Sequence, residues 1–167
     1  MRKSIIIITL LCFGTIIAKA QIPQPDPDTT AKHFLIVASI GNLQETSAGQ
    51  LATQMAKKPE VKAFAQMMVK DHGMSEQELL TLAKRKHIDL PAAATGGIQP
   101  DLMLKNGANF DKMYVHNMVS GHNNTAQTFQ NYATTGKDPE VKAWAQKMLP
   151  TLKVHLEHIK GIENQLK

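Results

Sequence analysis

Cysteine is almost absent from this sequence, because the only one among its 167 residues, Cys12, lies close to the N-terminus. The sequence also contains no Gly-rich phosphate loop and no G-x-S-x-G motif. Mechanisms that need a thiolate, an activated serine or a phosphate cradle therefore lack their sequence signatures. Without cysteine beyond Cys12, disulfides cannot stabilise the domain, so its stability has to come from a hydrophobic core.

Long apolar runs are missing too, except for residues 5–17, and this run is too short to cross a bilayer as a helix. A basic pair precedes the run, and an A-x-A pattern that ends at Ala20 follows it. These features predict a secretory signal peptide over residues 1–20. We expect the mature chain to have no transmembrane segment and to lie in the periplasm, either free or associated with the outer membrane.

The predicted mature chain has little excess of either charge, because its 16 Lys and Arg are nearly balanced by 14 Asp and Glu. The formal charge of +2 is too small, and too scattered, to form the basic stripe typical of a nucleic-acid interface. We therefore expect no nucleic-acid partner. Any contact with the cell envelope should be peripheral or should go through a protein partner.

A duplication organises the remaining chain. The segment PEVKAFAQMM begins at Pro59 and returns 80 residues later as PEVKAWAQKM at Pro139. Such a repeat indicates one supersecondary unit used twice. Two helical hairpins that cannot bury their apolar faces alone most simply close into a four-helix bundle. The sequence thus predicts an all-α, ferritin-like antiparallel bundle made from a duplicated hairpin.

Proline and capping residues predict where the parts begin and end. Residues 21–29 contain three prolines and predict a tether. Pro59 and Pro139 suit the first turn of a helix, and Asp138 is expected to cap the last helix. Gly41 lies in mid-helix, where glycine favours a close backbone approach. The bundle domain is expected over residues 30–166, with hairpin one at 30–87, a long crossover at 88–108 and hairpin two at 109–166.

Each predicted helix carries an apolar stripe at helical spacing, interrupted once by a residue that can bind a metal. In the repeat, His122 corresponds to Asn42 and His155 to Ser75, so the two histidines should face each other across hairpin two. In hairpin one the stripes are interrupted by Glu45 and His72. Both residues are displaced from the level of Asn42 and Ser75 in the same direction along the bundle, by one helical turn, roughly 5 Å. The four candidate ligands are Glu45, His72, His122 and His155.

This cluster of one carboxylate and three imidazoles has more than one interpretation. One ligand from each helix suits a mononuclear site for Zn, Fe, Mn or Cu. The same residues could instead form a hydrogen-bonded core network that sets the helix register in a structural or protein-interaction bundle. A third interpretation is haem held between the helices by a His and Met pair. The first of these predicts a non-catalytic envelope protein that binds one metal ion.

Several neighbouring residues bear on the metal interpretation. His158 lies one turn from His155 and is an additional candidate ligand. Met68 and Met118 each precede a candidate histidine by four residues, a pairing that could suit copper, although methionines at helical spacing more often fill a core. Asp71 is expected to face solvent or to hydrogen-bond behind a ligand.

Di-metal chemistry lacks its motif in this sequence. Ferritin-like di-iron proteins place a Glu on two helices and a Glu-x-x-His on the other two. Here Glu76 is followed three residues later by Leu79, and Glu157 by Lys160, so no Glu-x-x-His is formed at these positions. The single inward carboxylate, Glu45, cannot bridge two irons, and it also leaves a paired-carboxylate mechanism incomplete. The prediction is therefore against an enzyme.

Three separated segments, in order, resemble a known family. Residues 63–72, 110–114 and 148–156 are similar to motifs of the bacterial exported family catalogued as domain of unknown function 4142, and the likeness extends over about residues 30–163. The resemblance implies a ferritin-like bundle in the cell envelope, often described as an outer-membrane protein, but it implies no activity. The four candidate ligands fall at positions where this family carries Glu or His.

Overall fold

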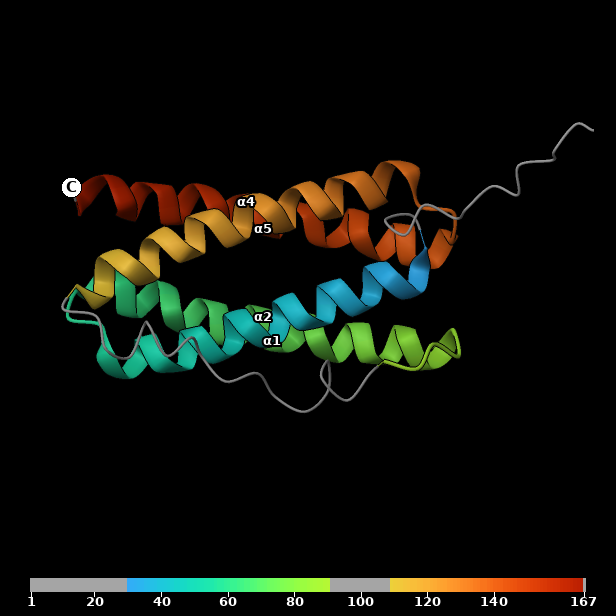
Figure 1. The fold of residues 1–167 in the computed structure, drawn as a ribbon, viewed down its shortest axis with the longest axis horizontal. Helices are drawn as coiled ribbons and strands as arrows, with labels where there is room; N and C mark the ends of the chain where they lie inside the picture. Colours follow the sequence, from blue (N-terminus) through green and yellow to red (C-terminus); the bar gives the residue numbers. More distant parts are fainter. Residues whose placement is uncertain (1–29, 91–108, 167) are drawn as a thin grey trace, which may run out of the picture.

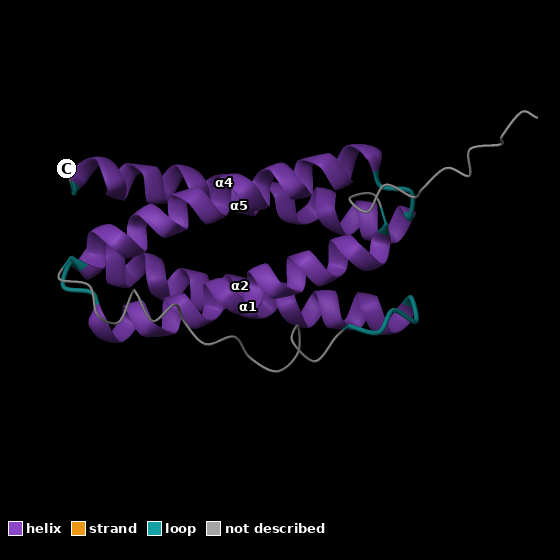
Figure 2. Cartoon of the chain, viewed as in Figure 1, coloured by secondary structure: helices purple, strands orange, loops and turns teal. Residues whose placement is uncertain are grey.

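The computed structural model describes residues 30–90 and 109–166. The predicted signal peptide and tether, and residues 91–108 of the predicted crossover, lie outside the described residues. Within the two described stretches the chain has four helices and no strand (Figure 2): α1 (Ala31–Met55), α2 (Pro59–Arg85), α4 (Phe110–Thr135) and α5 (Pro139–Gln165). The predicted all-α class is confirmed.

The helices pack as two antiparallel hairpins, α1 with α2 and α4 with α5 (Figure 1). Between the hairpins, α1 packs against α4 and α2 packs against α5. Because α2 ends at the opposite end of the bundle from the start of α4, these two helices run in the same direction.

The capping residues account for where the helices begin. Thr30 Oγ1 accepts a hydrogen bond from the His33 N–H at 3.2 Å, at the start of α1. Asp138 Oδ1 accepts from the N–H groups of Glu140 and Val141, both at 3.1 Å, so the predicted cap of α5 is confirmed. These bonds satisfy N–H groups that a helix cannot pair internally.

The end of α2 lies two residues before the predicted one. His87 has a φ of 53°, in the left-handed region, which stops the helix. The N–H groups of His87 and Ile88 then bond back to the carbonyl oxygens of Lys84 and Ala83, at 3.1 and 2.9 Å. This pair of bonds is a Schellman motif with histidine at the position where glycine is usual.

The predicted close approach at Gly41 is not found. A Cβ atom added at Gly41 would meet nothing within 4 Å, whereas one at Gly49 would lie 2.9 Å from the Ala65 carbonyl oxygen and 3.0 Å from Val69. The tight contact between α1 and α2 is therefore two turns further along α1. The expectation was wrong because the repeat identifies equivalent positions but not how near the helices come at each of them.

The core consists of two apolar clusters. One contains Phe64, Met68 and Tyr114 among its buried residues, and the other contains Phe34, Leu79 and Trp144. Within residues 30–90 and 109–166, no helix is both long enough and apolar enough to cross a membrane. Most of the predicted stripe positions are buried.

Candidate metal centre

A buried polar layer separates the two apolar clusters. On α2 the inward face passes from Met68 in one cluster, through His72, to Leu79 in the other, and the remaining helices do the same. The four predicted site residues are all buried, with exposed fractions of 0 to 5%. One candidate ligand comes from each helix: Glu45 from α1, His72 from α2, His122 from α4 and His155 from α5. Their side chains meet at one level of the bundle, so the predicted displacement of one helical turn between the two pairs is wrong. The repeat gives the register of the backbone, whereas long side chains can reach across a turn.

The three histidines meet at this level. His72, His122 and His155 each offer one ligand atom, and these atoms all lie within 4.8 Å of one another. The ring centroids are 5.5 to 5.6 Å apart in all three pairs. Three imidazoles from three helices therefore surround one small volume.

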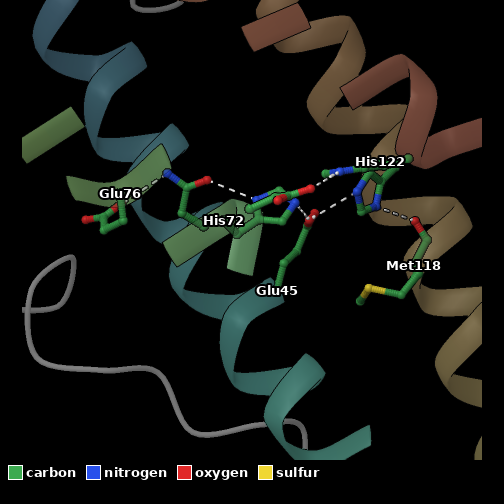
Figure 3. Close-up of polar contacts among 8 residues, drawn as sticks. Glu45, His72, Glu76, Met118 and His122 are labelled. Carbon is green, nitrogen blue, oxygen red and sulfur yellow. Dashed lines mark hydrogen bonds and ion pairs between the residues drawn. The ribbon is translucent and has the colours of Figure 1, made fainter. Parts of the chain in front are cut away.

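Glu45 lies against two of the three rings (Figure 3). Its Oε2 is 2.7 Å from His72 Nε2 and 3.3 Å from His122 Nε2. A tetrahedral ion with ligand bonds of 2.0 to 2.1 Å holds neighbouring donor atoms about 3.3 Å apart. The carboxylate oxygen therefore lies where a fourth donor to the same ion would be needed.

Each imidazole also uses its other ring nitrogen for a hydrogen bond to an oxygen that can only accept. The three pairs, each 3.0 Å apart, are His72 Nδ1 with Asn42 Oδ1, His122 Nδ1 with the Met118 carbonyl oxygen, and His155 Nε2 with Asp71 Oδ2. An acceptor on that side requires the nitrogen to carry the hydrogen. The opposite nitrogen of each ring then faces the centre of the layer, and in a neutral ring it carries a lone pair.

The inward atoms of the layer lack hydrogen bonds, as do a few other buried atoms, such as the Tyr114 hydroxyl oxygen and Trp144 Nε1. Four buried atoms, Glu45 Oε2, His72 Nε2, His122 Nε2 and His155 Nδ1, have no hydrogen-bond partner of acceptable geometry among the described residues. Lone pairs that converge in a dry interior repel one another unless a positive charge lies between them. The layer needs a proton or a metal ion at its centre, and the donor set fits a metal.

Behind His72 the polar contacts continue to a second buried carboxylate. Glu76 accepts from Ser39 Oγ at 2.6 Å and from Asn42 Nδ2 at 3.1 Å. Because the Asn42 amide donates to Glu76, its oxygen has to face His72, and this fixes the hydrogen on His72 Nδ1. Burial raises the pKa of Glu76, although the two hydrogen bonds oppose that shift.

The sequence analysis does not predict this chain of contacts, because it treats Glu76 only as the start of an absent Glu-x-x-His. A signal was present. Ser39 and Asn42 lie one turn apart on α1, and Glu76 lies one turn after His72 on the antiparallel α2. Asp71, in contrast, was predicted either to face solvent or to hydrogen-bond to a candidate ligand. It accepts a hydrogen bond from His155, so the second of these predictions is confirmed.

The electrostatics of the layer favour an ionised Glu45 and oppose protonation of His122 and His155. Burial opposes ionisation of Glu45, yet attraction to His72, His122 and His155 lowers its pKa. Burial lowers the pKa of His122, and Glu45 only partly offsets this. Burial likewise lowers the pKa of His155, and the hydrogen bond that its ring donates to Asp71 opposes this shift. Neutral imidazole is the form that binds a metal.

The additional candidate, His158, lies apart from the triad. It is exposed, and its ring packs edge-on against Phe64 with centroids 5.5 Å apart. Met68 is fully buried in an apolar cluster, and Met118 contacts His122 through its carbonyl oxygen. Whether the four central residues bind a metal stays a prediction.

Several solved structures share this fold. CopM in the Cu(II)-bound form aligns with a TM-score of 0.70 and 17% identity, over 82% of this chain and 97% of CopM. CopM in the Cu(I)-bound form gives 0.71 and 19%, over 82% and 97%. A DUF305 fragment from Deinococcus radiodurans gives 0.69 and 11%, over 81% and 95%. At these identities the likeness shows the fold alone.

A comparison with curated protein sequences found no match. In contrast, the family model described as a domain of unknown function, DUF4142, matches residues 17–162. The match spans α1, α2 and α4 completely and nearly all of α5. The resemblance noted in the sequence is confirmed, and the chain belongs to the DUF4142 family.

Proposed function

We propose that this protein is an exported, non-catalytic envelope protein that holds one transition-metal ion between His72, His122, His155 and Glu45. One observation carries the proposal. The inward nitrogen of each histidine is buried without a hydrogen bond, while its outward nitrogen is bonded to an acceptor. Metal-binding histidines have this arrangement, because the outer bond sets the tautomer and aims the lone pair.

A core network that serves only to set the helix register would pair its polar atoms with one another. Here the three imidazole hydrogen bonds point outward from the centre, and the inward atoms meet only in the close contacts of Glu45 Oε2 with His72 Nε2 and His122 Nε2, at 2.7 and 3.3 Å. Leaving a buried polar group unpaired costs about 1–3 kcal/mol. An ion at this point would satisfy all four atoms at once.

Copper is the ion we favour. Three imidazoles and a carboxylate suit Cu(II) and Zn(II), and Cu(II) binds such nitrogen and oxygen donors most tightly among the divalent first-row ions. The similar solved structures include CopM with Cu(II), with Cu(I) and with Ag. Zn(II) is the natural competitor in any test.

The surroundings of the site favour binding over turnover. The cavity that reaches the histidines has a volume of about 10 Å³, which admits about one water molecule. An organic substrate would need a cleft of several hundred Å³, and a porphyrin would need a similar space, so the geometry does not favour haem. Storage or transfer of the ion itself needs no substrate pocket.

Elemental analysis tests the proposal. The full-length chain, expressed with its own N-terminal segment and purified without tag or chelator, should contain about one metal ion per chain. A His72→Ala, His155→Ala variant should contain none, because it loses two of three imidazoles. A His33→Ala, His116→Ala variant removes the same number of histidines from exposed positions and should keep the ion.

A folded wild-type protein that stays metal-free after dialysis against Cu(II) and Zn(II) would contradict the proposal and favour the core network. A separate His158→Ala variant should keep full occupancy, since that ring packs on Phe64. Export is tested on the same cells: the mature chain should begin at Gln21 and appear in the periplasmic or outer-membrane fraction.

A further inference from the structure

A small cavity lies between α2 and α5, beside the three-histidine centre. Two of the three histidines, His72 and His155, form part of its wall, together with Asp71, Met148 and Thr151. Its volume of about 10 Å³ is enough for one water molecule or one ion that has shed most of its water. The centre is therefore adjoined by a space of the size that a passing ion needs.

The cavity leads from the surface to the histidines. The side chains of His72 and His155 are only 4% and 3% exposed, whereas that of Asp71 is 24% exposed. Thr151 is exposed and Met148 is half-buried. An ion on this path passes Thr151 and Asp71 before it reaches His155.

Asp71 is the only charged side chain among the residues that line this cavity in the described part of the chain. Its Oδ2 holds His155 Nε2 at 3.0 Å, so the carboxylate lies directly behind one proposed ligand. A carboxylate at a narrow, low-dielectric opening raises the local concentration of cations. The Met148 thioether next to it is a soft contact suited to copper or silver.

We propose that the metal ion enters and leaves the centre through this cavity between α2 and α5, and that the Asp71 carboxylate is the group that meets it first. The inference rests on the proposed function, because it assigns a route to the same site. The proposed route also predicts that the rate at which the metal ion binds depends on the charge near the opening between α2 and α5.

Thr151→Lys tests the route. Thr151 is exposed, lies on the cavity wall and is not one of the proposed ligands, so lysine adds a positive charge at the opening without removing a ligand. Gln127→Lys is the matched control, because it adds the same charge at an exposed position on α4, about one turn from His122. Loading is followed by stopped-flow mixing with Cu(II), through quenching of the single tryptophan, Trp144.

The Thr151→Lys variant should load about five- to tenfold more slowly than wild type at low ionic strength, and the difference should shrink in salt. Final stoichiometry should be unchanged, and Gln127→Lys should stay within about twofold of wild type. Equal loading rates for the two lysine variants would overturn the route while leaving the metal site intact. A wild-type protein that binds no ion would instead refute the proposed function.

Discussion

At the scale of single residues, the three histidines have three different acceptors behind them. Asn42 offers an amide oxygen, Met118 a backbone carbonyl and Asp71 a carboxylate. A charged acceptor strengthens the bond and makes the ring more basic than a neutral acceptor does. Each of the three rings is therefore held in place by one hydrogen bond, but the rings are not equivalent as ligands to a metal ion.

Asn42→Leu should weaken metal binding about 10- to 100-fold, because His72 then loses the acceptor that keeps its hydrogen on Nδ1. A competition titration against a chromophoric chelator measures this change. Asn123→Leu is the control, since Asn123 is exposed and bonds only to the Val119 carbonyl oxygen in its own helix. An unchanged affinity in Asn42→Leu would show that the outer hydrogen bond does not matter.

The metal-free protein should lose stability as the pH falls from about 7.5 to 5.5. His122 and His155 have pKa values lowered from 6.5, so below pH 6.5 the unfolded chain binds protons that the folded chain does not. Stability then falls with decreasing pH, by up to about 1.4 kcal/mol per pH unit for each histidine, until the folded pKa is reached.

Urea unfolding at three pH values in this window measures the slope. Glu76 acts in the opposite direction, because its raised pKa favours the folded state as the pH falls toward 4.5, and measurement above pH 5.5 avoids most of this effect. A His122→Gln variant should show a smaller slope than wild type. A wild-type stability that rises from pH 7.5 to 5.5 would refute the assignment of buried neutral histidines.

Single residues also mark the limit of what the sequence could predict. The four central residues were found because each interrupts an apolar stripe, which is a periodic signal. Asn42, Glu76 and Asp71 also lie at helical spacing from these residues, but polar residues at such positions are equally compatible with a solvated surface. Their roles depend on side-chain directions across the α1–α2 and α2–α5 contacts, and periodicity does not specify these.

At the scale of elements, the helix starts were predictable, but the closest contact was not. Proline at the first position of α2 and α5, and Asp138 before α5, are local signals that a sequence carries directly. The distance between α1 and α2 depends on both helices at once. The two helices come close at Gly49, where the backbone of α2 lies 2.9 Å from the position of an added Cβ.

Two glycine substitutions on α1 should act in opposite directions. Gly41→Ala should stabilise the protein by about 0.5–1 kcal/mol, because the new methyl group meets nothing and alanine favours the helix. Gly49→Ala should destabilise it by about 1–3 kcal/mol, because the methyl group collides with the Ala65 carbonyl oxygen. Chemical denaturation of both variants gives the comparison, and equal effects would contradict the packing described.

At the scale of the whole molecule, the candidate ligands come from both hairpins. Glu45 and His72 belong to the α1–α2 hairpin, and His122 and His155 belong to the α4–α5 hairpin. An ion at the centre would therefore join the two halves of the bundle across the polar layer. The duplicated sequence was enough to predict the bundle, whereas residues 91–108 of the predicted crossover and the predicted export segment lie outside the described residues.

Metal should raise the thermal stability of the whole bundle. At about 100 times its dissociation constant, an ion that binds only the folded chain adds about 2.7 kcal/mol, which corresponds to a rise in Tm of about 5–10 °C for a domain of this size. Differential scanning calorimetry with Cu(II), and after chelation, measures this shift. A folded protein with the same Tm under both conditions would indicate that the ion is not bound at the core.

The most direct test of the central claim is the position of the ion. Crystals grown with one equivalent of Cu(II) should give a single anomalous peak at the copper edge, about 2.0–2.2 Å from His72 Nε2, His122 Nε2 and His155 Nδ1, with Glu45 Oε2 adjacent. A peak confined to exposed histidines such as His116 or His158, with the central layer unchanged, would contradict the account.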